Sequence, residues 1–515
     1  MKNKRLCILV GVLIISLAIS GVVSAALPGS GWWTSYWVQN VGGDDGVITM
    51  TAYDSATAQV FDSQEFTFDF GRTLVYDPGV AMNYPAGNVV GFLDPIPAGF
   101  EGSVVLSSNV ESVATAQLSN FRNSSVGLVS SSATGNYQAF SAQLTDTELR
   151  FPIVKNNWSN AATTFYIQSA SESGSNVSMS YYMGDGIVYQ DTQFIEANKT
   201  YMFDPTAAGV PFENCGRDFN ESPCFGAAVA TSDTPIAGVV VEHPFQGSPI
   251  GAILTSRALT AADADTVLFA PSIKNNYVDA VAGASVMNIG NEDAKVRITI
   301  TVTIGPNAGQ VYTDEIIIPP NMTQTFSRHR NNLGGMPVGN FGAARIESVA
   351  DGVYSPQPLV GMSNETKAQT LTPMGYARTT HYLFAIGAAS DTNAAPKVIE
   401  YVGNFTGGMT VVNVGNAPTT IYFEYYDHRS DQVFEFWTTD PVQPGAAINT
   451  GRIARNRGGR FTNDGSFSFS EMNNKEFSAI AYTNDGTGIV NLITAFDPAT
   501  NKFYDTMNYE GFSLD

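Results

Sequence analysis

The stretch Val296-Arg297-Ile298-Thr299-Ile300-Thr301-Val302 decides the fold class, because apolar and polar residues alternate strictly along it. A period of two residues is typical of a β-strand with one buried face. The aromatic and β-branched run 420–426 predicts another strand. No twelve-residue stretch beyond the N-terminal segment carries the apolar period of a helix. The sequence therefore predicts an all-β protein.

The sequence around these strands repeats with a step of about 120 residues. Short predicted strands end 129, 119 and 125 residues apart, at Asn40, Ser169, Asn288 and Asn413. A second landmark begins with Phe at 100, 225 and 341, and we align residues 465–469 with it in the fourth copy. The apolar strand that follows lies at 112–116, 232–241, 358–362 and 477–482. The repeat predicts tandem domains over 30–148, 149–265, 266–392 and 393–515.

Each repeat holds seven to nine short predicted strands, which is typical of an antiparallel two-sheet β-sandwich of immunoglobulin-like type. An aromatic residue near the start of each copy is expected to fill the core between the sheets: Trp33, Trp158, Tyr277 and Phe405. Trp32, Tyr36 and Trp37 lie beside the first of these. They are candidates for exposed ligand-binding aromatics.

The N-terminus has the pattern of a secretory signal peptide. Lys2, Lys4 and Arg5 precede the apolar stretch 6–23, and small residues lead to a cleavage site after Ala25, with Ala26 as the second choice. The alternative is an uncleaved anchor, since 18 apolar residues are the lower limit for a membrane span. We expect a cleaved signal peptide over 1–25 and a secreted mature chain without a membrane span.

The charge of the chain excludes one class of partner. Only 14% of the 515 residues are charged, and 26 basic residues face 47 acidic ones. Removing residues 1–25 changes the formal net charge from −21 to −24. Nucleic-acid binding needs clustered Lys and Arg, so we expect no nucleic-acid partner.

Two cysteines remain after residue 25, Cys215 and Cys224, and they flank a polar loop. An even count in an exported chain predicts a disulfide between them, with two free thiols as the alternative.

The sequence nominates no catalytic residue. The four histidines, His243, His329, His381 and His428, are spread over three repeats without metal-ligand spacing, and we interpret them as exposed loop residues. No nucleophile elbow, zinc-protease motif or phosphate loop is present. We expect no enzyme activity and no cofactor. Calcium is the one alternative, at oxygen-rich turns that also suit hairpins, and its candidate ligands are Asp44, Asp45, Asp263 and Asp265.

The repeat landmarks resemble a family of tandem immunoglobulin-like repeats from large secreted proteins of filamentous bacteria. Residues 232–239 and 273–290 carry the resemblance most clearly, and it extends loosely over 30–500. The group is functionally uncharacterised, and the resemblance implies a cell-surface or matrix location without supplying a site residue.

Three functions compete at this point. The first is a secreted, non-enzymatic structural or adhesive protein, a rod of four domains that contacts proteins, glycans or other copies of itself at the cell surface. The second is an array of carbohydrate-binding modules, and the third is a secreted hydrolase. The framework character of the repeat favours the first.

Overall fold

The computed structural model describes residues 14–19 and 32–514, apart from 55–56, 58, 77–89, 91–99, 122–131, 142–143, 213–221, 245–252, 368–376, 403–404, 452–454, 456–458 and 497–505. These residues form five antiparallel β-sheets joined by turns and short 3-10 turns. The prediction of an all-β protein is confirmed. Within the described part of the chain, no helix has the length and apolar character needed to cross a membrane.

Segment one, residues 14–140, forms two four-stranded sheets. The first sheet has the order β1 (Ile14–Ile19), β6 (Glu101–Ser108), β3 (Gly46–Asp54) and β4 (Val60–Phe68). The second has the order β5 (Thr73–Tyr76), β2 (Trp32–Asn40), β7 (Ser112–Phe121) and β8 (Ser132–Gln138).

Segment two, residues 146–259, repeats this pairing order in one seven-stranded sheet, because its long strand β14 serves in place of both β6 and β7. Its strands are β9 (Asp146–Trp158), β10 (Ala161–Ser169), β11 (Ser175–Met183), β12 (Val188–Ile195), β13 (Thr200–Phe203), β14 (Phe225–Pro244) and β15 (Leu254–Arg257).

Segment three, residues 267–385, has the order β19-β18-β21-β16-β17-β22-β23, with β20 beside β17 and β24 beside β16. The bounds are β16 (Val267–Tyr277), β17 (Ala280–Asn288), β18 (Ala294–Ile304), β19 (Val311–Ile318), β20 (Thr323–Phe326), β21 (Asn340–Ser348), β22 (Leu359–Lys367), β23 (Ala377–Tyr382) and β24 (Phe384–Ala385).

Segment four, residues 392–514, has the order β30-β28-β27-β31-β25-β26-β32-β33, with β29 beside β26 and β34 beside β25. The bounds are β25 (Thr392–Val402), β26 (Phe405–Asn413), β27 (Ile421–Asp427), β28 (Val433–Thr438), β29 (Ala447–Asn449), β30 (Phe461–Thr462), β31 (Lys475–Thr483), β32 (Ile489–Phe496), β33 (Thr506–Glu510) and β34 (Phe512–Leu514).

The second strand of every segment is nine residues long and ends at one of the landmark residues, Asn40, Ser169, Asn288 or Asn413. The three asparagines are fully buried and make the same hydrogen bonds. In Asn288, Nδ2 donates to the carbonyls of Glu292 (2.7 Å) and Ile318 (2.8 Å), while Oδ1 accepts from the N–H of Gly290 (2.9 Å). These bonds satisfy the backbone where the strand turns.

Asn40 bonds Asp44, Phe68 and Gly42, and Asn413 bonds Ala417, Val442 and Gly415, in the same pattern. Ser169 keeps the bond to the N–H two residues on and adds one to Ser175. The shared geometry explains why one residue type recurs at this step along the sequence.

The fourth copy needs a correction in two places. Residues 465–469, aligned above with the Phe landmark, begin no sheet strand, and Phe469–Met472 forms a 3-10 turn instead. The strand between β25 and β27 is β31, so residues 477–482 correspond to the Phe landmark of the other segments and not to the strand after it. That following strand is β32, which pairs with β26.

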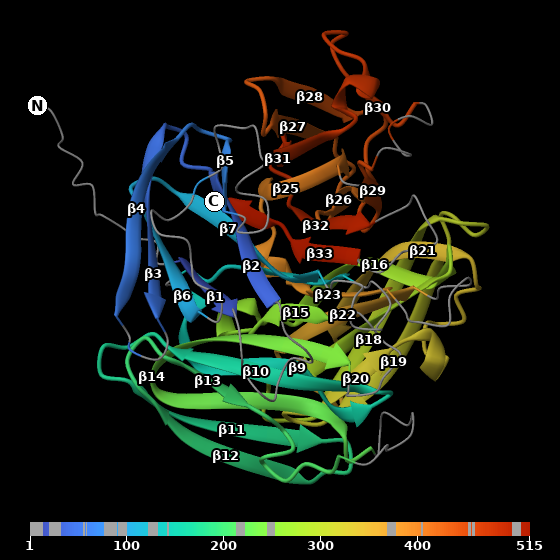
Figure 1. Ribbon diagram of the computed structural model, residues 1–515. Coiled ribbons are helices and arrows are strands. Elements are labelled where there is room, and N and C mark those ends of the chain that lie inside the picture. The colour runs from blue at the N-terminus through green and yellow to red at the C-terminus, as the bar shows by residue number, and fades with distance from the viewer. Residues whose placement is uncertain are drawn as a thin grey trace, which may run out of the picture.

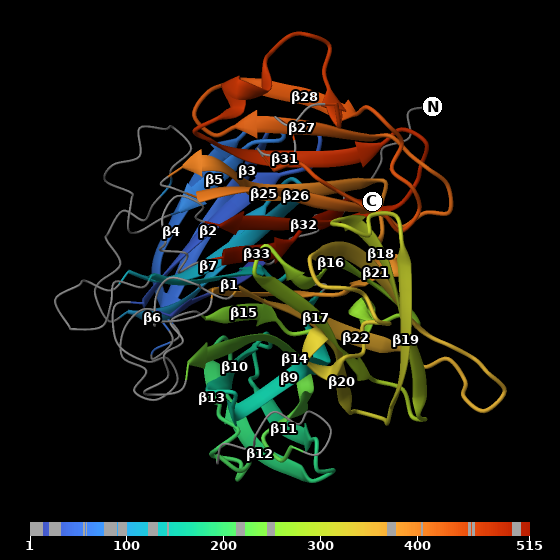
Figure 2. The ribbon, with the colours of Figure 1, turned by 90° about the vertical axis from the view of Figure 1, so that its right-hand side faces the viewer.

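The four segments surround a common centre, and the first contacts the last (Figure 1). In the view at right angles, no segment extends away from the other three (Figure 2). Its surface is 20626 Å², close to the roughly 18,000 Å² of a compact protein of this mass and below the roughly 26,000 Å² of four separate units. The expectation of an extended rod is therefore wrong.

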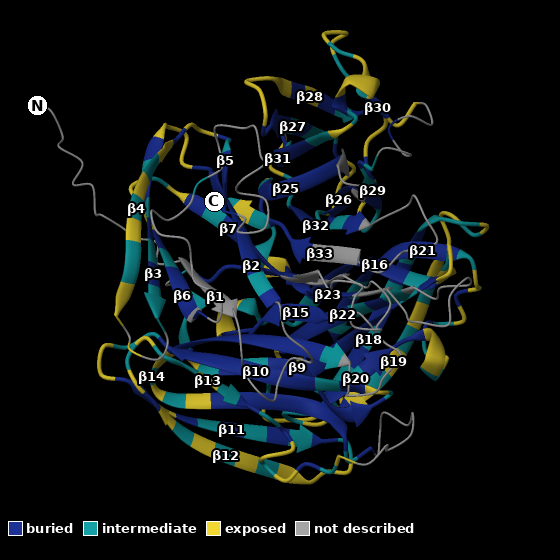
Figure 3. Cartoon of the chain, in the orientation of Figure 1, coloured by how far each residue is buried: buried dark blue, intermediate teal, exposed yellow. Residues whose placement is uncertain are grey.

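Burial follows this arrangement, with the buried residues lying between the sheets and toward the centre (Figure 3). One apolar cluster joins segments two, three and four, through Leu259, Phe269, Met287, Phe384 and Val412 among others. Another joins the sheets of segment one to Tyr166, Val239 and Ile253 of segment two. The segments are thus held together by shared apolar cores as well as by the chain between them.

Candidate functional site

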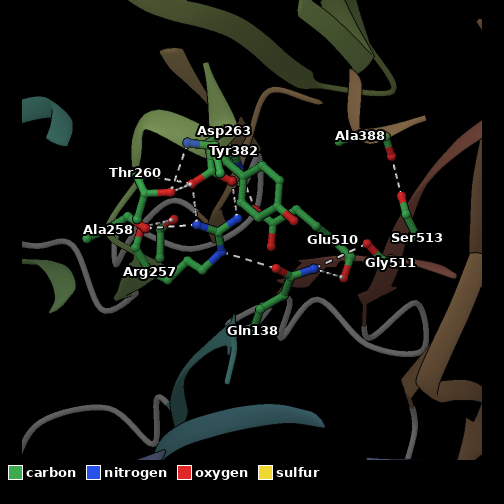
Figure 4. Close-up of polar contacts among 12 residues, drawn as sticks. Gln138, Arg257, Ala258, Thr260, Asp263, Tyr382, Ala388, Glu510, Gly511 and Ser513 are labelled. Atoms are coloured by element: carbon green, nitrogen blue, oxygen red, sulfur yellow. Dashed lines mark hydrogen bonds and ion pairs between the residues drawn. The ribbon is translucent and has the colours of Figure 1, made fainter. Parts of the chain in front are cut away.

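The candidate site is a buried polar cluster at the centre, where one strand from each segment ends. The last residues of β8, β15, β23 and β33 share one register: Gln138, Arg257, Tyr382 and Glu510. Each lies opposite a residue of the neighbouring strand, β7, β14, β22 or β32. That residue in turn lies opposite the position three residues before the landmark on the second strand. Figure 4 shows that these four side chains converge. We call them the central quartet.

The central quartet makes a closed circuit of contacts. Arg257 Nε donates to Gln138 Oε1 (3.1 Å), and the Arg257 guanidinium lies 4.4 Å from the centre of the Tyr382 ring. The backbone N–H of Tyr382 donates to Glu510 Oε1. Gln138 Nε2 donates to the carbonyls of Glu510 (3.3 Å) and Gly511 (3.2 Å). Each segment is therefore bonded to the next, and segment four to segment one (Figure 4).

Asp263 neutralises the one cation of the quartet. Its two carboxylate oxygens accept from Arg257 Nη1 (2.8 Å) and Nη2 (2.5 Å), in the bidentate geometry that makes such pairs strong. The same carboxylate accepts the N–H (2.8 Å) and hydroxyl (3.1 Å) of Thr260 at the start of a 3-10 turn. The carboxylate of Asp263, one of the predicted calcium ligands, thus binds Arg257 and Thr260.

Glu510 is the carboxyl group of the quartet, and it is buried. Burial raises the pKa of Glu510 to about 7, although the Tyr382 N–H acts in the opposite direction. With the carboxyl protonated, the charges of Arg257 and Asp263 cancel and the cluster is neutral. Ionisation would leave one uncompensated negative charge in a buried site, which is costly.

Two further junctions use buried charge in the same way. Between segments two and three, Glu242 Oε2 accepts from Lys155 Nζ (2.6 Å) and from Asn364 Nδ2 (3.3 Å). Between segments four and one, Lys397 Nζ lies 3.3 Å from the Trp37 ring centre and donates to Gln117 Oε1 (2.8 Å). The buried charged groups named here therefore join segments.

The arrangement at the centre suits closure of the ring better than chemistry. A cavity beside Glu242, Asn364 and Thr380 has a volume of about 10 Å³, which is no more than the space for one water molecule. The guanidinium of Arg257 is already paired, and the quartet contains no thiol or hydroxyl nucleophile other than the phenol of Tyr382. Burial raises the pKa of this phenol strongly, so it stays protonated.

The aromatics predicted to be exposed lie in the core. Trp32, Tyr36 and Trp37 are 8%, 2% and 3% exposed, respectively. Tyr36 stacks on Tyr76, and Trp37 Nε1 donates to Glu476 Oε1 (2.9 Å) of segment four. The prediction of exposed ligand-binding aromatics is wrong, because β2 is a central strand covered on both faces.

The calcium candidates lie in separate places. Asp44 and Asp45 are exposed in the turn after β2, and Asp45 accepts from the N–H of Phe70 (3.2 Å). Asp265 accepts from the N–H groups of Val267 and Gly387 (3.3 Å each). Among the residues that the structure describes, no three His, Cys, Asp or Glu side chains form a group that could hold a metal ion.

Three of the four histidines differ from the expectation of exposed loops, and only His329 is exposed. His243 lies in β14 and is half-buried. His381 lies in β23, His428 follows β27, and both are buried. Burial lowers the pKa of His381 to about 3 and that of His428 to about 4. Cys215 lies outside the described residues, so the predicted disulfide stays a prediction. Cys224 is buried at the start of the β14 region.

Sequence reasoning missed the quartet. Its members are single polar residues in short strands without a spacing motif, and the repeat alignment did not extend to β8, β15, β23 and β33. The quartet can be located only by following the strand pairing from each landmark residue across the sheet. That pairing is known from the structure and not from the sequence.

A second shared feature lies on the periphery, on the outermost long strand of each segment. The first residue of β4, β12, β19 and β28 is an exposed valine: Val60 (54%), Val188 (48%), Val311 (56%) and Val433 (38%). Phe194 and Ile317, further along β12 and β19, are also exposed. β4, β12 and β19 end their sheets, so they present unpaired backbone beside these side chains.

Comparisons with known proteins add no family. No protein-family model matches the sequence, and no curated protein does. Among solved structures, a tetra-tandem repeat in the extending region of a large adhesion protein aligns over 98% of this chain and 99% of its own, at 10% identity and a TM-score of 0.11. A glycoside hydrolase of family 32 from Bifidobacterium adolescentis aligns over 97% and 96%, at 7% identity and 0.13. TM-scores this low do not indicate a shared fold.

Proposed function

We propose that this chain is a secreted, non-enzymatic adhesive or structural protein of the cell surface or matrix. In this proposal each segment is one copy of an immunoglobulin-like β-sandwich, residues 1–25 are a cleaved signal peptide, and Cys215 and Cys224 form a disulfide. The four copies act as one closed body that offers its periphery to partners.

The observation that carries the proposal is the repetition of exposed apolar residues on edge strands. Proteins usually protect the edges of their sheets with charges, prolines or bulges, because an open apolar edge invites association. Here Val60, Val188 and Val311 are the first residues of the edge strands β4, β12 and β19. These three strands lie at different places around the ring (Figure 1). A body with several equivalent contact edges suits cross-bridging of protein or glycan surfaces.

The enzymatic alternatives have less support. The predicted sugar-binding aromatics are buried. The polar groups of the central quartet already bond one another across the segments. The cavity beside the junction of segments two and three, with a volume of about 10 Å³, is too small for a substrate.

The test replaces the exposed valines by charges. The triple variant Val60→Lys, Val188→Lys, Val311→Lys should reduce binding to envelope fragments of the producing cell by roughly tenfold or more. Val353→Lys is the matched control, because Val353 is 81% exposed and lies in the bend between β21 and β22, outside the edge strands. Thermal unfolding should be unchanged in both. Unaltered binding by the triple variant, or hydrolysis of a glycan by the wild type, would contradict the proposal.

A further inference from the structure

The first strand of segment one comes from the predicted signal peptide. In segments two, three and four, β9, β16 and β25 pair with β14, β21 and β31, respectively. In segment one the same place beside β6 is filled by β1, Ile14–Ile19, with Ile14 opposite Leu106 and Ile19 opposite Glu101. Cleavage after Ala25 would remove β1 and leave β6 without this neighbour.

After cleavage, the residues that remain before β2 are too few to form a strand in place of β1. In segments two to four a proline lies 17 residues before the landmark residue: Pro152, Pro271 and Pro396. Each lies at a β-bulge, where the pairing register shifts and a proline is tolerated within a strand. In segment one the nearest preceding proline, Pro28, is only 12 residues before Asn40, and six residues, 26–31, separate the cleavage site from β2.

β1 also fits the place imperfectly. Its pairing with β6 runs over six residues without a register shift, whereas β9, β16 and β25 are 11 to 13 residues long and each contain the bulge. Those three strands also continue into the second strand through a hairpin pairing, which joins the two halves of the segment. In segment one the two sheets stay separate.

We propose that the secreted chain carries a vacant strand position beside β6 and that this position binds a β-strand from another polypeptide. This inference rests on the proposed cleavage of residues 1–25. The donor strand runs antiparallel to β6 and has the chemistry of the strands that fill the equivalent positions. They read Phe-Pro-Ile-Val-Lys at 151–155, Ala-Pro-Ser-Ile-Lys at 270–274 and Ala-Pro-Lys-Val-Ile at 395–399.

Physical reasons favour such a donor. An unpaired central strand exposes N–H and C=O groups and the core beneath them, and strand addition satisfies both. Val104 and Leu106 of β6 are 0% and 2% exposed and belong to the core shared with segment two. Within the described chain, β9, β16 and β25 are already paired in their own segments, so the donor belongs to another molecule.

The test uses the exported protein and a labelled peptide of residues 146–158. The N-terminus of the exported chain is first determined by intact mass under denaturing conditions, which also detects a co-purified donor. Peptide binding is then measured by fluorescence anisotropy. The Arg150 N–H bonds Leu259 on the side away from β14, so by alternation the Leu149 N–H faces β14. A Leu149→Pro peptide should bind roughly tenfold or more weakly, while the matched Arg150→Pro peptide retains binding.

A graft completes the design. Replacing residues 26–31 by the sequence of residues 146–160 restores the 17-residue spacing and joins Trp32 in register, because Trp32 and Ala161 both lie eight residues before their landmarks. The graft should abolish peptide binding and raise the unfolding temperature.

Binding by the wild type and its loss in the graft, or a second chain in the mass spectrum, would support the inference. A chain cleaved near Ala25 that holds no second chain, binds no peptide and is not stabilised by the graft would overturn it. An exported chain that still begins at Met1 would overturn it too, by showing that residues 1–25 are retained. That result would identify the cleavage premise as the failure.

Discussion

The landmark asparagines show what one buried side chain contributes at the residue scale. Asn288 is fully buried and holds three backbone groups at the end of β17. Asn288→Ala should lower the free energy of unfolding by roughly 2–4 kcal/mol, because it leaves two buried carbonyls and one buried N–H without their hydrogen-bond partner. Urea denaturation measures this. Asn288→Ser should cost less, since Ser169 keeps part of the network in segment two; equal losses for both variants would contradict this account.

Glu510 gives the centre a pH dependence. Its pKa is raised to about 7 by burial, against about 4.3 in an unfolded chain. The unfolded state therefore releases its proton first as the pH rises, so stability is lost between about pH 4 and pH 7, by roughly 4 kcal/mol in total. Glu510→Gln keeps an acceptor for the Tyr382 N–H and removes the charge. Relative to the wild type, it should gain stability as the pH rises from 5 to 8; a constant difference would count against a protonated Glu510.

His381 acts in the opposite direction. Burial, with a smaller effect of Lys274, lowers its pKa to about 3, and neither ring nitrogen has a hydrogen-bond partner among the described residues. Below about pH 6.5 the unfolded chain binds a proton that the folded chain does not, so stability is lost as the pH falls. His381→Leu should remove about 1.4 kcal/mol of this loss per pH unit between pH 6 and 4. Chemical denaturation at the two pH values, with exposed His329→Leu as the control, tests it.

At the element scale, the strands were predictable from alternation and landmarks, but one local competition was not. Residues 466–469 alternate Ser and Phe as a strand would. Ser468 and Glu471 form a capping box instead, and the chain turns into a 3-10 helix. Likewise, the burial of Trp37 could not be predicted from the sequence, because Lys397, which packs on its ring, lies 360 residues later in the chain.

The loop before β14 carries a prediction of its own. If Cys215 and Cys224 are bonded, the closed loop of about ten residues should stabilise the chain by roughly 2.7 kcal/mol. Intact mass after alkylation, with and without reductant, measures the bond in exported protein. Cys215→Ser should lower the unfolding temperature as much as reduction does. Two labels taken up without reductant would reject the disulfide.

At the scale of the whole molecule, the closed ring was beyond sequence reasoning, because tandem repeats read equally well as a rod. Closure depends on contacts between residues hundreds of positions apart, such as Arg72 Nη1 with the carbonyls of Asp427 (2.9 Å) and Ser430 (2.7 Å). Ser478 Oγ donates to the carbonyl of Gly71 (2.7 Å) across the same junction. Each contact is weak by itself, and the ring closes because many of them and the central quartet act together.

Closure makes a prediction about shape. A compact chain of this length should have a radius of gyration of about 23 Å, whereas four units of roughly 40 Å in line would give roughly 40 Å or more. Small-angle X-ray scattering of the wild type should give the smaller value. In Arg257→Leu, Asp263 loses its cation while Gln138 and Tyr382 lose their shared partner. Because an unpaired buried charge is costly, this variant should unfold at a lower temperature and, before unfolding, scatter as a more open particle. The matched variant Arg297→Leu, whose ion pair with Glu315 is exposed on β18, should keep both the compact profile and nearly the full stability. A compact Arg257→Leu protein of unchanged stability would mean that the apolar clusters alone close the ring.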